Sequence, residues 1–468
     1  MKKKFISVLL GTAMLSTVLT GCGNSSNKEA SSSPVASTET EKETEVKESE
    51  APATEEIAGG EKVDLYILQY KVEIHDALQN AVNKYMELHP NVNITLETVG
   101  GGDDIGVVYK SKAAAGQMPD IFNAIGPEEC GTYMEYLEDL SDQPWVSHAN
   151  SGMLDLNTID GKVYGLPLSA EAFGLVYNKA IFEAAGIDAS TLTSYDAIDS
   201  AFATLQGKID AGELKDQFPD LKAVTAVQGA EKWVLGDHAV NVALAPEFNE
   251  DVFALANAKE IQFSYKDAYQ SYMDLQLKYS INRDDYKGAV AVDYSTAVKE
   301  LLGLEQVAVI QQGNWIYGDV KSIDENVANN LAFLPAPIKG YKEDSIITLV
   351  ANYWCVNSQS DANKKLVAKD FLNWLYQSEE GKQIVVNEFG FLPVFDNYGD
   401  LAPADNLSRS ILDFAAEGKA VSAVFKGTPG AAWLQDVFGA KVQGYLTGEL
   451  TWDQVFEQSA AEWASMRK

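Results

Sequence analysis

The sequence predicts an α/β fold with parallel strands, divided between two lobes. Between Val63 and Leu96, apolar residues alternate with polar ones, then recur three or four apart, then alternate again. A strand, a helix and a strand within about 35 residues form a βαβ unit, whose strands are parallel. From residue 61 the chain continues for about 400 residues, more than one hydrophobic core usually supports, so two lobes are expected.

Each predicted element rests on a local pattern of apolar residues. In chain order, we expect strands over 63–67 and 92–96 around a helix over 78–86, a helix ending near 115, and a strand over 120–124. Downstream, we expect a strand over 307–310, a helix over 361–376 and a last helix that opens at the Thr451 and Gln454 capping box. Trp374, Trp452 and Trp463 fall on the apolar faces of the last two helices, so we assign them to core packing.

The first 22 residues have the pattern of an export signal. Lys2, Lys3 and Lys4 precede an apolar run over 5–18, which is shorter than the roughly 20 residues that span a bilayer. Cys22 follows small residues, and this arrangement resembles the lipobox of bacterial lipoproteins. The resemblance implies that residues 1–21 are a signal peptide and that Cys22 is acylated, anchoring the protein to the extracellular face of the cell membrane. An ordinary secreted protein and a signal anchor are the alternatives.

Composition narrows the function classes further. The formal net charge of −32 becomes −35 when the three lysines of the signal are removed, so binding to nucleic acid or anionic lipid is disfavoured. Residues 22–60 are rich in Ser, Thr, Glu, Ala and Pro, which predicts a disordered acidic tether. Cys130 and Cys355 are expected to be buried unpaired thiols, and the scattered histidines lack the spacing of a zinc site.

Short motifs follow one another in a fixed order. They are a Gly-x-x-Pro-Asp turn at 116–120, a segment at 160–167, a strand leading into 178–182, Ala-Gly-Ile at 185–187, Gly-Asn-Trp at 313–315, and segments at 379–383 and 390–394. Each motif is weak by itself. Their order over residues 63–463 resembles the extracellular solute-binding proteins that feed ABC importers, and is most similar to the carbohydrate binders of the maltose-binding type.

The resemblance implies a periplasmic-binding-protein-like fold, with two α/β lobes joined by a multi-strand hinge and a ligand cleft between them. One lobe would hold residues 61–169 plus 351–395, and the other 170–350 plus 396–468. The chain would cross between them near 169–175, 349–356 and 394–397.

The same resemblance implies a non-catalytic binder without a cofactor. It would capture an oligosaccharide, of the malto-oligosaccharide or raffinose type, by lobe closure. The expected partners are the membrane permease subunits and their ATPases, and the binder itself is expected to be a monomer. The alternatives are a binder of a polyamine, a peptide or a metal ion, and an extracellular glycoside hydrolase, which needs two carboxylates flanking one bond.

A sugar offers a flat C–H face and a ring of hydroxyls, so its binder needs aromatic rings together with carboxylates and amides. By resemblance, Trp315 is expected to stack on the ligand rather than pack in the core, and Glu171 to contact it rather than serve as a structural hub. Trp433 is equally expected to stack or to pack. Trp233, Asp237, His238 and Asn241 belong to a loop that contacts ligand or is buried for structure. The weaker candidates are Asn123, Glu128 and Tyr70.

Overall fold

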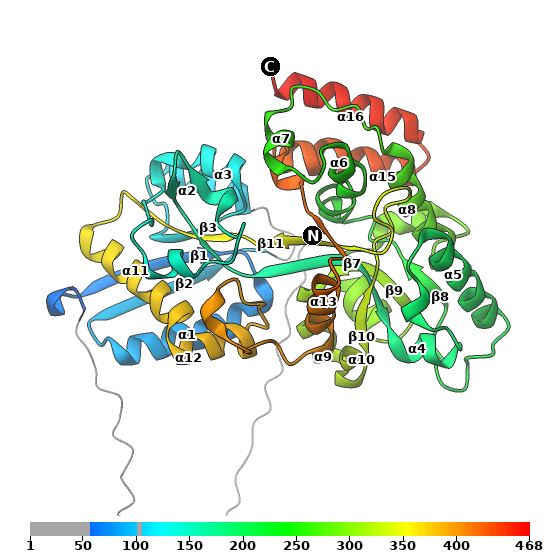
Figure 1. Cartoon of the computed structure of the whole chain (residues 1–468), viewed down its shortest axis with the longest axis horizontal. Helices are drawn as coiled ribbons and strands as arrows, with labels where there is room; N and C mark the ends of the chain where they lie inside the picture. The colour runs from blue at the N-terminus through cyan, green and yellow to red at the C-terminus, as the bar shows by residue number, and fades with distance from the viewer. Residues whose placement is uncertain (1–56, 101–104) are drawn as a thin grey trace, which may run out of the picture. The chain divides into compact units, whose positions relative to one another are not determined.

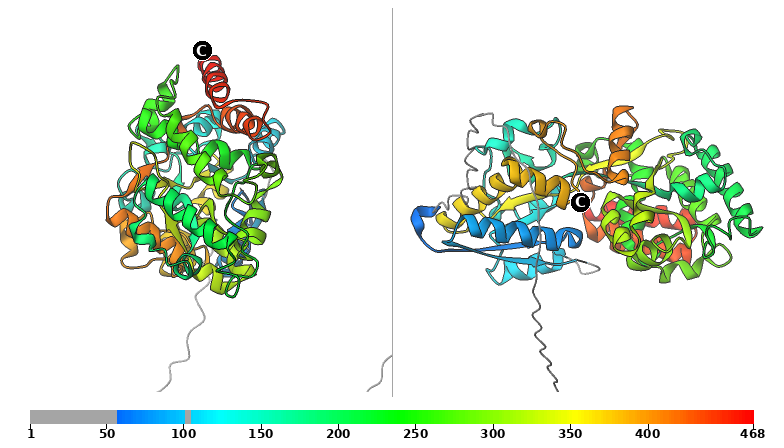
Figure 2. Two further views of the ribbon diagram at one scale, coloured as in Figure 1. Left: turned by 90° about the vertical axis from the view of Figure 1, so that its right-hand side faces the viewer. Right: turned by 90° about the horizontal axis from the view of Figure 1, so that it is seen from below.

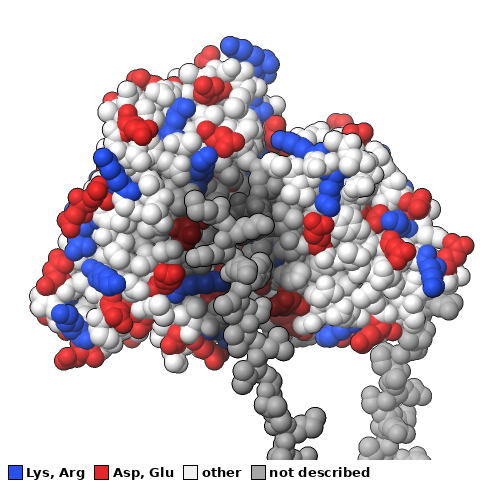
Figure 3. All heavy atoms as spheres, turned by 180° about the vertical axis from the view of Figure 1, so that it is seen from behind, with Lys and Arg blue, Asp and Glu red and all other residues white. Residues whose placement is uncertain are grey.

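The structure is a computed structural model that describes residues 57–100 and 105–468. The predicted signal peptide, Cys22 and the tether up to residue 56 lie outside the described residues. Within the described ranges, no helix combines the length and the apolar character needed to cross a membrane. On the face shown in Figure 3, acidic and basic side chains of the described residues are interspersed rather than gathered by sign.

The first sheet has the strand order β2-β1-β3-β12-β6. Its strands are β1 (Val63–Gln69), β2 (Val92–Thr98), β3 (Ile121–Ala124), β6 (Leu166–Pro167) and β12 (Tyr353–Val356). β1 is parallel to β2 and β3, as the βαβ pattern predicts, while β12 is antiparallel to β3 and β6. Alternation along β1 buries Val63, Leu65 and Ile67 on one face.

Helices cover both faces of the first sheet (Figure 1). They are α1 (His75–Leu88), α2 (Ile105–Ala114), α3 (Pro127–Thr132), α11 (Ala362–Gln377) and α12 (Glu379–Gln383). α1 and α11 lie side by side (Figure 2, right), where Tyr85 and Phe371 are in edge-on contact at 5.1 Å between ring centroids. The opposite face packs against α2 and α3 through a second core that contains Tyr109 and Cys130.

The second sheet has the order β13-β11-β7-β9-β8, and β10 also pairs with β7. The strands are β7 (Ala170–Asn178), β8 (Ala223–Ala226), β9 (Val307–Gly313), β10 (Leu331–Leu334), β11 (Ile346–Val350) and β13 (Ala420–Ser422). β7 pairs with β11 over its first half and with β10 over its second half, while its other edge pairs with β9. Outside both sheets, β4 (Thr158–Ile159) and β5 (Lys162–Val163) form a small hairpin.

The helices around the second sheet come from the rest of the chain (Figure 1). They are α4 (Lys179–Ala184), α5 (Tyr195–Asp210), α6 (Asn241–Glu247), α7 (Val252–Asn257), α8 (Lys266–Lys278), α9 (Tyr317–Ile323), α10 (Glu325–Asn329), α13 (Asn406–Ala416), α14 (Ala431–Trp433), α15 (Ala440–Leu446) and α16 (Trp452–Met466). The predicted capping box is confirmed, since Thr451 and Gln454 bond each other's backbone at the start of α16. Trp452 and Trp463 are buried in this core, and Trp374 packs against the core of the first sheet, as predicted.

The chain passes between the sheets where β6 leads to β7 and where β11 leads to β12, close to the two crossings expected first. The third crossing, expected at 394–397, stays a prediction, because Leu392 packs in a core of the second sheet while the residues that follow pack in that of the first. Phe395 and Tyr398 stack on each other within the core of the first sheet, and Leu401 packs against the same core. Leu407 then lies in the same core of the second sheet as Leu392. The assignment of whole segments to two lobes stays a prediction.

Cys130 and Cys355 are both free and buried, as expected. The Cys130 thiol donates to Asn157 Oδ1 at 2.9 Å, and Asn157 Nδ2 donates to the Cys355 sulfur at 3.7 Å. The two thiols are therefore bridged by one amide.

Candidate functional site

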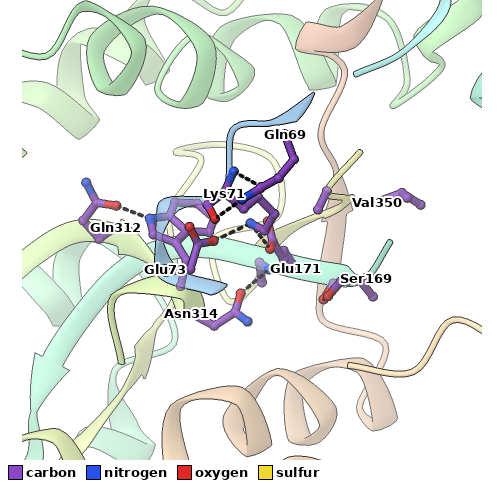
Figure 4. Close-up of polar contacts among 12 residues, drawn as sticks. Gln69, Lys71, Glu73, Ser169, Glu171, Gln312, Asn314 and Val350 are labelled. Carbon is purple, nitrogen blue, oxygen red and sulfur yellow. Dashed lines mark hydrogen bonds and ion pairs between the residues drawn. The ribbon is translucent and has the colours of Figure 1, made fainter. Parts of the chain in front are cut away.

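A buried ionic group joins the two sheets. Lys71 lies two residues beyond β1, and Glu171 is the second residue of β7. Lys71 Nζ lies 2.7 Å from Glu171 Oε1 and 2.7 Å from Glu73 Oε1 (Figure 4). Lys71 and Glu171 are 6% and 5% exposed. Burial opposes the charge of Lys71, yet Glu171 and Glu73 beside it hold the pKa of its ammonium above the ordinary value.

Glu171 was predicted to contact the ligand, with a structural role as the alternative. Here one of its oxygens is bound by Lys71, so Glu171 has at least a structural partner, and ligand contact stays a proposal. Sequence reasoning missed Lys71 and Glu73. The available signal was their place directly after a strand of a parallel sheet, at the carboxyl edge where ligands bind in α/β folds.

A second buried lysine holds the segment between β11 and β12. Lys426 Nζ donates to the carbonyl oxygens of Val350 and Ala351, at 2.8 Å for the latter. Burial lowers the pKa of its ammonium to about 7, although Glu171 and Glu129 oppose this shift. Lys426 was also missed, because nothing in its local sequence distinguishes it from a surface lysine.

Trp233, His238 and Trp315 gather around one aromatic group. The His238 ring stacks on Phe173 of β7 at 4.2 Å and 13°, meets Trp233 edge-on at 5.0 Å, and lies 5.2 Å from Trp315. Trp233 and Trp315 are half-buried. Three of these four residues are sequence candidates from two separate segments, and the fold brings them together beside the strand that carries Glu171.

Hydrogen bonds hold both tryptophan rings in place. Trp233 Nε1 donates to Glu231 Oε2 at 2.7 Å, and Trp315 Nε1 donates to Gln312 Oε1 at 2.8 Å. The Trp315 ring lies against the backbone of Gly313, where an added Cβ would come within 2.1 Å of the ring. The glycine of the Gly-Asn-Trp motif is therefore required by close approach of the indole, and the ring positions are fixed before any ligand arrives.

Asp237 and His238 carry buried atoms without partners among the described residues, namely Asp237 Oδ1 and His238 Nδ1. Burial raises the pKa of the Asp237 carboxyl to about 7, against the hydrogen bond that Gln435 donates to it. Burial lowers the pKa of His238 to about 3, so this ring is neutral at physiological pH.

The raised pKa of Asp237 predicts a pH effect on stability. Between about pH 4 and pH 7 the folded state keeps a proton that the unfolded state has released, so Asp237 destabilises the fold increasingly as the pH rises. Replacing Asp237→Asn removes this ionisation. The variant's melting temperature is expected to rise relative to wild type by more at pH 8 than at pH 5, as measured by thermal unfolding. An equal difference at both pH values would contradict the expectation.

Two of the predicted site residues, Asn241 and Trp433, make structural contacts inside the protein. Asn241 is fully buried, and its side chain donates to the carbonyls of Asp237 and His238 and accepts from the amides of Val424 and Phe425. It therefore ties the loop to the segment after β13, the structural alternative left open for this loop.

Trp433 is 0% exposed. It stacks near Phe438 at 5.6 Å, meets Trp463 edge-on at 4.9 Å, and donates to the Ser459 carbonyl. Trp433 therefore packs in the core, which is one of its two expected roles. The aromatic core of α14–α16 surrounds its ring.

The remaining candidates lie on or after strands of the first sheet. Asn123 of β3 is 1% exposed, and Tyr70 directly follows β1. Burial raises the pKa of the Tyr70 phenol. Glu128 in α3 is exposed, and its carboxylate oxygen Oε2 lies 3.7 Å from Arg467 Nη1. Tyr70 and Asn123 thus lie at the carboxyl edge that also carries Lys71, whereas Glu128 lies at the surface.

The family of the chain follows from a comparison with family models. The model described as bacterial extracellular solute-binding protein matches residues 80–409, more than half of the 468 residues. The chain belongs to this family.

Two relatives of the chain have names that describe sugar binding. The melibiose/raffinose/stachyose-binding protein MelE of Bacillus subtilis is 23% identical over 66% of this chain and 68% of its own length. The xylose/arabinose-binding protein XacG of Haloferax volcanii is 25% identical over 58% of each chain. A sugar transporter of Bacillus licheniformis, solved in complex with stachyose, is 20% identical, with a TM-score of 0.66 over 86% of this chain and 100% of its own. This likeness confirms the periplasmic-binding-protein-like α/β fold.

Proposed function

We propose that this protein is the substrate-binding lipoprotein of an ABC importer and that its ligand is a neutral oligosaccharide. The observation that carries the proposal is the aromatic group of Trp233, His238 and Trp315 beside the ionic group of Lys71 and Glu171. Half-buried indoles match the C–H faces of sugar rings. The ligand names of MelE and of the stachyose complex support a raffinose-type ligand, and that of XacG keeps pentose sugars among the candidates.

The balance of charge favours a neutral ligand over a polyamine. The ammonium of Lys71 is bound by Glu73 and Glu171, and Lys426 lies beside the same group. A cationic ligand would have to displace Lys71 from its carboxylates, which is costly for a buried pair. Both carboxylates are held by one ammonium group, an arrangement suited to fixing a binding surface rather than to cleaving a glycosidic bond.

Binding would proceed by closure of the two lobes around the ligand, followed by delivery to the permease. The lipid anchor at Cys22 would keep a monomeric binder next to its transporter. A Cys22→Ser variant should then be released into the medium.

The proposal is tested by thermal shift and calorimetry with raffinose, stachyose, maltotriose, xylotriose and spermidine. At least one sugar should raise the melting temperature, with saturable binding and intact ligand recovered. Stabilisation by spermidine and by none of the sugars would refute the sugar claim. Release of shorter sugars during incubation would refute the non-catalytic function.

A further inference from the structure

A chain of three hydrogen bonds lies behind the Trp315 indole. The indole Nε1 donates to Gln312 Oε1 at 2.8 Å (Figure 4), Gln312 Nε2 donates to Gln228 Oε1 at 2.7 Å, and Gln228 Nε2 donates to the Gln311 carbonyl at 2.9 Å. Gln228 and Gln312 are 1% and 0% exposed. The two buried amides thus connect the half-buried ring to a backbone carbonyl of β9.

The pairing of two strands brings the glutamines together. Gln312 belongs to β9, and Gln228 lies two residues beyond the end of β8. Ala226 and Ile310 are partners in these parallel strands, and two further residues along each of them lead to Gln228 and Gln312. The contact between the amides therefore depends on the sheet and not on a sequence motif.

Donors and acceptors fix the orientation of both amides. A backbone carbonyl can only accept, so the Gln311 carbonyl determines which end of the Gln228 amide faces it. The oxygen of Gln228 then accepts from the nitrogen of Gln312, which leaves the oxygen of Gln312 for the indole, a group that can only donate. Turning either amide over would bring two donors or two acceptors together. A buried network that is satisfied in this way specifies one arrangement.

Gln228 also supports the residue that holds the second indole. Its carbonyl accepts from the backbone amide of Glu231 at 3.1 Å. Glu231 Oε2 accepts from Trp233 Nε1, and Glu231 Oε1 accepts from the backbone amide of Tyr294, both at 2.7 Å. The acceptors of the two indoles are therefore both bonded to this one buried residue.

We propose that Gln228 is a positioning residue for the Trp315 indole, acting through Gln312, and that it raises sugar affinity without touching the sugar. The inference rests on the proposed function and adds to it a residue behind the binding surface. A ring whose angle is fixed in advance loses less conformational freedom when a sugar stacks on it. Without Gln228, the Gln312 amide can turn its nitrogen towards the indole, which then lacks an acceptor.

Gln228→Met tests the inference, because methionine is similarly long and unbranched but has no amide. In the ligand-free protein, the Trp315 indole proton should exchange with solvent at least about 10-fold faster than in wild type, as measured by NMR. Trp315→Phe identifies the indole signal by its loss. Affinity for the tightest-binding sugar among raffinose, stachyose, maltotriose and xylotriose should fall about 5-fold, as expected for one hydrogen bond.

A double-mutant cycle separates positioning from a merely structural role. Trp315→Phe keeps a ring but removes its N–H, so adding Gln228→Met to it should cost no further affinity. Gln312→Met should lower the affinity as much as Gln228→Met does, and the two together no more than either alone, because they act in series. A Gln228→Met loss that persists in the Trp315→Phe background would overturn the inference.

Gln206→Met is the matched control. Gln206 lies in α5, is 7% exposed, and accepts from the amide of Val224 in β8, the strand that leads to Gln228. Its removal should lower the melting temperature, because the Val224 amide loses this acceptor. Indole exchange and sugar affinity should both stay at the wild-type values.

Failure of the inference and failure of the proposed function give different results. If Gln228→Met changes indole exchange and affinity no more than Gln206→Met does, Gln228 is not a positioning residue. If wild type binds none of the four sugars, the proposed function fails. Faster indole exchange in Gln228→Met alone would then still support the positioning of Trp315, and equal exchange in both variants would overturn it.

Discussion

Replacing Lys71→Met is expected to lower the free energy of unfolding by about 3–5 kcal/mol, measured by urea denaturation at pH 7.5 without ligand. The substitution leaves the carboxylate of Glu171, which is 5% exposed, without the ammonium that binds it. An uncompensated buried charge has a penalty of that size.

Two further variants make this prediction specific. Lys71→Met combined with Glu171→Met removes both buried charges and should recover most of the loss. Lys84→Met breaks a pair with Glu380 in which both side chains are exposed, 3.5 Å apart, and should cost about 0–1 kcal/mol. A Lys71→Met loss no larger than that of Lys84→Met would show that the inter-sheet pair is not buried in solution.

Replacing Trp315→Ala is expected to weaken sugar binding by about 2 kcal/mol, or roughly 30-fold in the dissociation constant. The indole is half-buried, is held by Gln312, and lies in the aromatic group with His238. Its removal takes away the apolar plate against which a sugar ring would pack. Calorimetric titration with the tightest-binding sugar of the probe set measures the change.

Two variants on the same segment control for this prediction. Trp315→Phe keeps an aromatic plate and should retain most of the affinity. Tyr317 lies two residues later, bonded through its hydroxyl to Asn329 of α10, and Tyr317→Ala should leave the affinity unchanged. Equal affinity of Trp315→Ala and wild type would remove Trp315 from the site.

Much of the fold was predictable because it depends on local periodicity. The first strand, first helix and second strand appear where alternation and helical spacing indicate them, and parallel pairing follows from that order. The capping box at Thr451 was equally local. The packing around the expected third crossing is not local in this way, because the Phe395–Tyr398 stack belongs to a core assembled from distant segments.

The candidate site was predicted less completely. The segments of Trp233, His238 and Trp315 carried recognisable motifs, and the fold brings them together. Trp433 was not distinguishable from them by sequence, because a tryptophan of the core and one of a site differ only in what surrounds them. Lys71 and Lys426 lack a motif, and their importance lies in burial, which no local pattern reveals.

The sequence by itself determined the class of fold, the order of the elements and the family, because these depend on residue spacing along the chain. The tertiary structure alone decided which polar groups far apart in the sequence are paired. Lys71 meets Glu171 across 100 positions, and Lys426 meets the Ala351 carbonyl across 75 positions. The physical reason is that burial and hydrogen bonding are properties of neighbours in space, and the chain brings those neighbours together from both sheets.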